Sequence, residues 1–366
     1  MKKILLLLLL AIAHLGLSAN NIVQRDKQTN EIIHAKYKLL NYLKKKQGIQ
    51  TLFGHQDDTV YGHDWWNKNN KSDVYETSGK YPSVYGWELG GIENGSKRSL
   101  DSVKFKDIRK QIIIADSRGG INTISWHLNN PTNNHSAWDK TNHSVYNILY
   151  DKQTNIIYRS WVKRLSKFFK SLKRSDGTLI PILFRPFHEM NGNWFWWGKS
   201  YCTKQEYIKL WILTEKLLES YNVHNLLYIY STDNVNSKEE YMERYPGDNL
   251  VNILGVDCYH RNGNIGIENY KRNANNVLRI VKSEAQMHNK VYVFSETGCE
   301  SISVNNWYTE ILYPILHKYH PAYILIWRNA YTIKNHFFVP YQGHKEANDF
   351  KRFTDSKDII MQSNAN

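Results

Sequence analysis

Cysteine and proline are scarce in this sequence, and long apolar segments are missing after its first residues. The 366 residues include only 3 Cys and 8 Pro. Three cysteines cannot form a disulfide framework, so a large core must hold the fold together. No segment beyond the N-terminus is apolar enough for a transmembrane helix, and we expect a soluble mature protein.

The first 19 residues are organised like a signal peptide. Lys2 and Lys3 precede an apolar run from Ile4 to Ile12, and small residues occur near Ala19. The run is shorter than the roughly 20 residues of a spanning helix. Because no cysteine lies near the cleavage region to carry a lipid, we expect a periplasmic or extracellular protein without a membrane anchor.

The charge and aromatic content favour some partners over others. The net charge is +14, but the lysines are scattered and form no basic stripe, so no nucleic-acid partner is predicted. The 12 Trp and 25 Tyr exceed what a core of this size needs. Such side chains suit a surface that binds sugars, although a tyrosine-rich core is an alternative explanation.

Short β-rich apolar runs recur along the chain, and each ends in polar or aromatic residues. Stretches with helical spacing lie between most of them, for example Trp161 to Leu172 and Tyr207 to Leu217. Strands alternating with helices predict a parallel sheet, and eight strands can close into a barrel. The runs are Thr51 to His55, Ser83 to Glu88, Asn122 to His127, Ile180 to Glu189, Leu226 to Thr232, Ile253 to His260, Val291 to Glu296 and Tyr323 to Arg328.

These patterns predict an α/β protein, a (β/α)8 TIM barrel that forms a single catalytic domain over residues 20–366. No linker or compositional shift marks a second domain. In such barrels the chemistry lies at the carboxyl ends of the strands, where several of these polar residues stand.

The fourth run leads into the most informative segment. Phe184 to Gly192 contains Arg185, His188 and Glu189, and it continues directly into Trp194 to Gly198. We expect several of these aromatic rings to line an open cleft. A carboxyl group beside indoles loses hydration, which raises its pKa, so Glu189 is a candidate general acid. The alternative is a structural partner for Arg185.

A second carboxylate ends the seventh run. Val291 to Glu296 is an apolar strand that delivers Glu296 opposite the end of strand four. A separation of about 5 to 5.5 Å between the Glu189 and Glu296 carboxyl groups would suit double displacement with retention of configuration.

The chain resembles glycoside hydrolase family 26, which consists chiefly of β-mannanases with an acid/base after strand four and a nucleophile after strand seven. The resemblance spans most of the chain after the signal peptide. Its marks are Gly54 to Asp58, Trp126-His127, Arg185 to Gly198, Gly255 to His260, Ser295-Glu296 and Trp327-Arg328.

The resemblance implies a role for each matching residue. Glu189 would be the acid/base and Glu296 the nucleophile, with Tyr259 hydrogen-bonded to the nucleophile. The other implied sugar-binding residues are His127, His188, Trp194, Trp327 and Arg328. A structural role is the alternative for His127, Tyr259 and Trp327, and Arg185 is expected to support the pair electrostatically.

The implied reaction is hydrolysis of β-1,4-mannosidic bonds in a mannan polysaccharide or manno-oligosaccharide by a monomer that needs no cofactor and no metal. The same mechanism acting on β-1,3-xylan or mixed-linkage β-glucan, and a non-catalytic carbohydrate-binding barrel, remain alternatives. The segments Trp65 to Lys80 and Asn129 to Asp151 are candidates for loops that would block one end of the cleft.

Two further hypotheses concern the ligand-rich and sulfur-containing residues. A disulfide between Cys258 and Cys299 would require suitable geometry after strands six and seven. A cluster of potential metal ligands near strand one makes a metal-dependent hydrolase or deacetylase an alternative, although a metal would need ligands from further strands as well. The candidates for that cluster are His55, Asp57, Asp58, His63 and Asp64.

Overall fold

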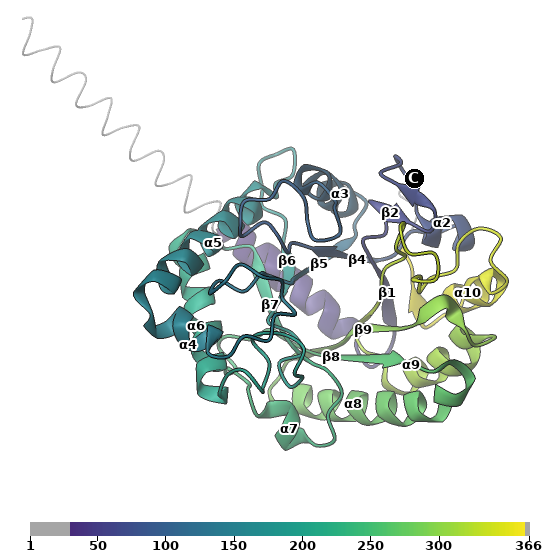
Figure 1. Cartoon of the computed structure of the whole chain (residues 1–366). Coiled ribbons are helices and arrows are strands. Elements are labelled where there is room, and N and C mark those ends of the chain that lie inside the picture. The colour runs from purple at the N-terminus through teal and green to yellow at the C-terminus, as the bar shows by residue number, and fades with distance from the viewer. Residues whose placement is uncertain (1–29, 363–366) are drawn as a thin grey trace, which may run out of the picture.

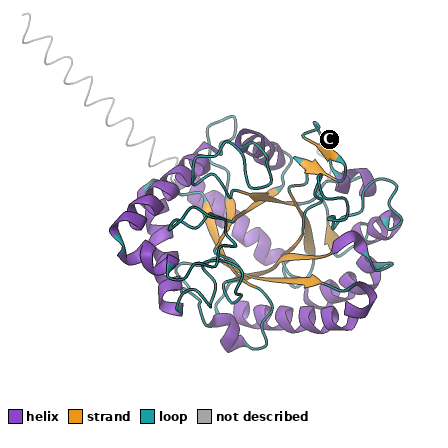
Figure 2. Ribbon diagram, viewed as in Figure 1, coloured by secondary structure: helices purple, strands orange, loops and turns teal. Residues whose placement is uncertain are grey.

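Eight parallel strands close into a barrel in the computed structural model, which describes residues 30–362 (Figure 1). Each strand pairs with its neighbour in chain order, and β10 pairs with β1 to close the ring. Helices surround it in a single domain (Figure 2), as the alternating pattern predicts. The barrel strands are β1 (Thr51–Gln56), β4 (Val84–Glu88), β5 (Ile121–Trp126), β6 (Ile182–Pro186), β7 (Leu226–Thr232), β8 (Ile253–His260), β9 (Val291–Cys299) and β10 (Tyr323–Ile326).

Two strands end three residues away from the predicted position, and the other strand ends lie within two residues of it. β6 stops at Pro186 because Phe187 and Glu189 adopt left-handed φ values of 49° and 54°, which no strand can accommodate. β9 continues to Cys299 because its pairing with β8 extends to His260. Glu296 therefore lies inside a strand, and Glu189 lies in the loop that follows one.

The helices follow the expected apolar spacing. α5 buries Trp161, Leu165 and Phe169 on one face, and α6 begins with a capping box between Thr203 and Glu206. The principal helices are α3 (Phe105–Ser117), α4 (Ser144–Tyr150), α5 (Lys152–Ser171), α6 (Lys204–Ser220), α8 (Ile267–Met287), α9 (Tyr313–Tyr319) and α10 (Ala347–Thr354), with the short α2 (Asp73–Ser78) and α7 (Lys238–Met242).

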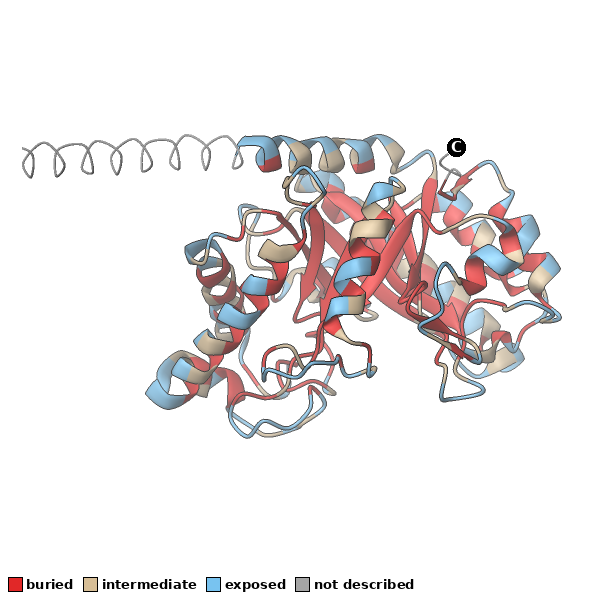
Figure 3. Ribbon diagram, turned by 90° about the horizontal axis from the view of Figure 1, so that it is seen from above, coloured by how far each residue is buried: buried red, intermediate tan, exposed pale blue. Residues whose placement is uncertain are grey.

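One end of the barrel is closed by a helix that the sequence patterns did not predict. Residues 30–46 are helical and lie across the end opposite the long loops (Figure 3). Leu43 is fully buried against Leu52 and Tyr323 inside the barrel, and Leu39 and Leu40 pack beside them. The carboxyl ends of the strands lie at the opposite, open end of the barrel, where the candidate active site is located.

Several smaller features complete the fold. The antiparallel hairpin of β2 (Tyr61–Gly62) and β3 (Trp65–Trp66) and the short β11 (Ile359–Ile360), which pairs with β1, have no clear signal in the sequence. All three cysteines are buried and free, so the hypothesis of a disulfide between Cys258 and Cys299 is wrong.

Within residues 30–362, no helix combines the length and the apolar character that crossing a membrane requires. The predicted signal peptide, residues 1–19, lies outside the described residues.

Candidate active site

An irregularity between β8 and β9 places two consecutive side chains of β9 in the barrel interior. Val256 pairs with Phe294, whereas the next residue, Asp257, pairs with Glu296, so Ser295 is the extra residue of a bulge. In a regular strand Ser295 and Glu296 would point to opposite faces. The bulge lets Ser295 bond Asp257 while Glu296 also points into the site.

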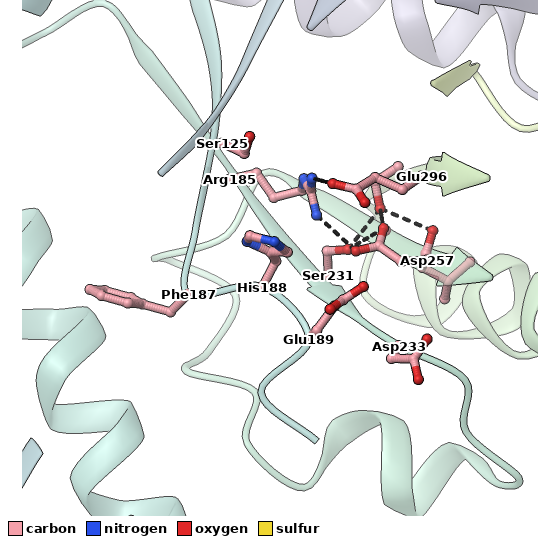
Figure 4. Close-up of polar contacts among 12 residues, drawn as sticks. Ser125, Arg185, Phe187, His188, Glu189, Ser231, Asp233, Asp257 and Glu296 are labelled. Atoms are coloured by element: carbon pink, nitrogen blue, oxygen red, sulfur yellow. Dashed lines mark hydrogen bonds and ion pairs between the residues drawn. The ribbon is translucent and has the colours of Figure 1, made fainter. Parts of the chain in front are cut away.

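Arg185 lies between the two carboxylates that this register brings together (Figure 4). Its Nη1 donates to Oδ2 of Asp257 over 2.8 Å, and its Nη2 donates to Oε1 of Glu296. All three side chains are buried. The planar, permanently charged guanidinium suits two carboxylates at once. The predicted electrostatic support of the two glutamates by Arg185 stays a prediction.

Asp257 is itself held by two hydroxyl groups. Ser231 and Ser295 donate to its Oδ1 over 3.0 and 2.7 Å. Burial raises the pKa of Asp257 to about 7, against the opposing effect of Arg185. A pKa in that range lets Asp257 take up a proton near neutral pH.

Glu296 has a second donor and faces Glu189. The Tyr259 hydroxyl donates to its Oε2 over 2.7 Å, so both oxygens of Glu296 are bonded and its orientation is fixed. Single carboxylate oxygens of Glu189, Asp257 and Glu296 all lie within 4.8 Å of one another. The two glutamates predicted from strands four and seven therefore meet across the barrel mouth.

Glu189 is presented by a strained loop. The left-handed φ values on either side of His188 are uncommon for residues with side chains and recur at functional sites. The Glu189 amide donates to the carbonyl of Ser231 over 2.9 Å, and the indole of Trp194 donates to its Oε2 over 2.6 Å. Gly192 is required beside it, because a Cβ there would lie 2.4 Å from the Trp194 ring.

The surroundings of Glu189 favour its protonated form. Burial is the largest cause that raises its pKa well above the ordinary value, and the carboxylates of Asp257, Glu296 and Asp233 add to it. The hydrogen bond from Trp194 acts in the opposite direction. Desolvation and neighbouring negative charge are the conditions expected for a general acid.

Two histidines form a chain that starts at a buried acid. Glu88 Oε2 lies 2.6 Å from Nδ1 of His127, whose Nε2 lies 3.1 Å from Nε2 of His188. Burial opposes protonation of His127, but Glu88 raises its pKa. Burial, aided by Arg185 and His127, lowers the pKa of His188 well below its usual value. The pair therefore consists of one imidazole that favours its proton and one that stays neutral.

A cavity of about 770 Å³ opens above these groups, within the usual size range of ligand pockets. It contains most of the predicted site residues, together with several that the sequence patterns missed. The predicted residues that line it are His127, His188, Glu189, Trp194, Tyr259, Glu296 and Trp327, and the additional ones include Trp138, Asp233, Arg261, His336 and Phe338.

Two of the four aromatic rings in the segment Trp194 to Trp197 line the cleft, where several were expected. Trp194 and Phe195 line the cavity, but Trp196 and Trp197 are fully buried and donate to backbone carbonyls. Arg328 is not among the lining residues. Its guanidinium binds Asp101 over 2.9 Å, and its predicted contact with sugar hydroxyls stays a prediction.

The two candidate loops contribute unequally to the cavity. Trp138, from the segment Asn129 to Asp151, lines it and stacks on His127. No residue of the segment Trp65 to Lys80 is among the lining residues.

The ligand-rich residues near strand one do not converge on one point. His55 pairs with Asp58 over 2.8 Å, while Asp57 accepts from Tyr61 over 2.8 Å and His63 stacks on Tyr341. The carboxylates of Glu189, Asp257 and Glu296 could also attract a cation, but two of the three already pair with the positive charge of Arg185. The site is therefore built for carboxylate chemistry.

Known proteins with a similar sequence are glycoside hydrolases. The model of glycosyl hydrolase family 26 matches residues 28–325. A mannan endo-1,4-β-mannosidase of Bifidobacterium adolescentis is 30% identical over 320 residues, 81% of this chain but only 32% of that protein. A Bacillus subtilis protein of the same name is 29% identical over 74% of this chain and 73% of its own length.

Solved structures agree with the family match. A family 26 β-mannanase from Bacteroides ovatus has 38% identity and a TM-score of 0.87, covering 89% of this chain and 94% of that one. A modular endo-β-1,4-mannanase from Cellulomonas fimi has 29% identity and a TM-score of 0.82, covering 90% and 76%. The fold and site are those of a glycoside hydrolase. The chain belongs to glycosyl hydrolase family 26, which confirms the resemblance noted from its motifs.

Replacing Arg185 tests its role between the buried carboxylates. Arg185→Met leaves Glu296 and Asp257 unpaired, so the free energy of unfolding is expected to fall by about 3 to 5 kcal/mol in urea denaturation at pH 7. Arg174→Met is the matched control, because it breaks a half-exposed pair with Asp116 and is expected to cost about 1 kcal/mol or less. Equal losses in the two variants would contradict the role.

Replacing Trp194 tests the hydrogen bond to Glu189. Without the indole donor in Trp194→Phe, the ionised form of Glu189 is less favoured, so its pKa rises. The basic limb of the pH profile of kcat/KM is therefore expected to move to higher pH. Trp196→Phe is the control, because its indole donates to Leu128 instead. An unmoved basic limb in Trp194→Phe would show that Glu189 does not set it.

Proposed function

We propose that this chain is an endo-acting β-mannanase that cleaves β-1,4-mannosidic bonds with retention of configuration. The observation that carries the proposal is the pair Glu189 and Glu296, with carboxylate oxygens within 4.8 Å at the floor of an aromatic-lined cavity. That approach is short of the 6.5 to 9.5 Å typical of inverting enzymes, which need room for a water molecule. The names of the relatives above support mannan as the substrate.

In the first step Glu296 attacks the anomeric carbon. Arg185 and Tyr259 each bond one of its oxygens, so the carboxylate is oriented before the sugar arrives. Glu189 gives its proton to the leaving oxygen as the glycosidic bond breaks. The products of this step are a mannosyl ester of Glu296 and a shortened chain.

In the second step Glu189 acts as a base. The ester has removed the negative charge of Glu296, which is one of the causes of the raised pKa of Glu189. The pKa of Glu189 therefore falls, and its carboxylate can take a proton from the attacking water. Release of the ester returns both glutamates to their starting states.

The aromatic rings of the cavity provide stacking surfaces for sugar rings. Trp194 and Trp327 lie on the same cavity as the pair, and Trp138 extends the aromatic surface outward with almost half of its area exposed. Flat indoles present an apolar face to the C–H groups of a pyranose. We also propose that residues 1–19 direct secretion and that the chain acts as a monomer.

Product analysis tests the substrate and the catalytic residues together. Purified protein is incubated with linear mannan, mixed-linkage β-glucan and β-1,3-xylan, and released oligosaccharides are followed over time. Mannan-specific release is expected, with products of several lengths appearing early if cleavage is internal. Glu189→Ala is expected to lose about 10²- to 10⁴-fold of the activity on mannan, and Glu296→Ala more.

Two controls separate catalytic loss from misfolding. Glu310→Ala replaces an exposed glutamate outside the cavity and is expected to keep full activity. An aryl mannoside with a leaving group that needs no proton should still release its aryl group in the Glu189 variant but not in the Glu296 variant. Activity on another polymer alone would replace the substrate, and full activity of Glu296→Ala would overturn the mechanism.

A further inference from the structure

A second cluster of ligand-type side chains lies at the end of the barrel opposite the catalytic pair. His317 is in the last turn of α9, His320 caps that helix, and Asp358 precedes β11. Backbone hydrogen bonds tie two of them to the segment that enters β1. The Gly48 amide donates to the His320 carbonyl over 2.7 Å, and the Thr51 amide donates to the Asp358 carbonyl over 2.8 Å. The barrel itself thus holds these residues together.

The three side chains converge at metal-binding distances. One potential ligand atom from each of His317, His320 and Asp358 lies within 4.8 Å of the others. His317 Nδ1 lies 2.6 Å from Asp358 Oδ2, and the two imidazole rings are nearly perpendicular, with centroids 5.4 Å apart. Nδ1 of His320 is buried and has no hydrogen-bond partner among the described residues. A buried polar atom without a partner is unfavourable unless a ligand or water satisfies it.

We propose that His317, His320 and Asp358 form a binding site for one divalent cation of the zinc class. Two imidazole nitrogens and one carboxylate oxygen are a ligand set that zinc accepts, with water completing a tetrahedron. Imidazole ligands favour Zn²⁺, Ni²⁺ or Cu²⁺ over Mg²⁺ and Ca²⁺, which prefer oxygen donors.

The surroundings of Asp358 direct its carboxylate toward the cluster. Asp358 is buried, and its Oδ2 accepts hydrogen bonds from Nδ1 of His317 over 2.6 Å and from the Tyr313 hydroxyl over 3.2 Å. It therefore offers an oxygen ligand on the same side as the two imidazoles.

Binding exchanges a proton for the metal. When the Asp358 carboxylate is ionised, Nδ1 of His317 carries the proton and donates it in the hydrogen bond to Oδ2 of Asp358. The cation takes its place, the proton leaves to solvent, and the two atoms move apart to reach about 2.0 to 2.2 Å from the ion. The ion would then link α9 to a segment 41 residues further along the chain.

Calorimetric titration of the full purified chain with ZnCl₂ tests the site. One saturable equivalent of Zn²⁺ is expected, with proton release that appears as a dependence of the heat on buffer ionisation enthalpy. The thermal midpoint should rise with Zn²⁺ and not with Mg²⁺, because an ion that binds only the folded state stabilises it. Hydrolytic activity should be unchanged, since the site is at the opposite end of the barrel.

Three variants assign the ligands. His317→Ala, His320→Asn and Asp358→Asn are each expected to weaken Zn²⁺ binding by at least about 10- to 100-fold, the loss seen when even a residue that supports a ligand is removed. Asparagine tolerates the left-handed backbone of His320, and His317 is 59% exposed, so these variants should fold. His288→Ala is the matched control, because it removes a histidine paired with an acid, Asp248, outside the cluster.

The outcomes are distinct from those of the catalytic tests. Loss of the zinc equivalent in the three variants, with binding kept in His288→Ala, would establish the site. No saturable binding by the parent chain, or binding by His317→Ala as tight as that of the parent, would overturn it.

Discussion

The guanidinium of Arg185 between Asp257 and Glu296 is the interaction on which the catalytic face depends. These three ionisable side chains are buried together at the barrel mouth, and in residues 30–362 the guanidinium is the ion-pair partner that both acids share. Two carboxylates without a counter-ion could not both remain ionised at this distance. Asp257 and Glu296 in turn add to the effect of burial, which is the largest cause that raises the pKa of Glu189.

The strands and their register, more than the loops, position Arg185, Asp257 and Glu296. The bulge at Ser295 places Asp257 and Glu296 side by side, and β6 delivers Arg185 from across the barrel. Glu189 is the exception, because it is placed by a strained loop and not by a strand. Its position is maintained by Trp194 and by the carbonyl of Ser231, so Glu189 depends on contacts of its loop that Glu296, inside a strand, does not need.

Much of the fold was predictable because each barrel strand is a short apolar run ended by a polar residue. The runs beginning at Leu226 and Ile253 match β7 and β8 residue for residue. Strand ends were less predictable. β6 ends where Phe187 adopts a left-handed backbone and a buried position, and neither can be read from the apolar pattern of the sequence. The helix of residues 30–46 was missed because few of its residues are apolar. Its contact with the end of the barrel depends mainly on Leu39, Leu40 and Leu43.

The site was predictable where a motif and a strand coincide, as at Glu296, and not where tertiary packing decides. The tryptophans at positions 194, 196 and 197 look equivalent in the sequence, yet of the three only Trp194 lines the cavity. Asp257 carried a usable signal, because it lies two residues before Tyr259 and therefore on the same side of its strand. For Trp138 the signal was limited to its loop, Asn129 to Asp151, because a loop without periodicity does not show which of its side chains enters the cleft.

The most direct test of the central claim is the configuration of the first product. Proton NMR can follow the anomeric signals of a manno-oligosaccharide in the first minutes of cleavage, before mutarotation equilibrates them. Double displacement by Glu189 and Glu296 predicts that the β-anomer of the new reducing end appears first. Initial formation of the α-anomer would mean that water attacks directly, and it would remove Glu296 from the role of nucleophile.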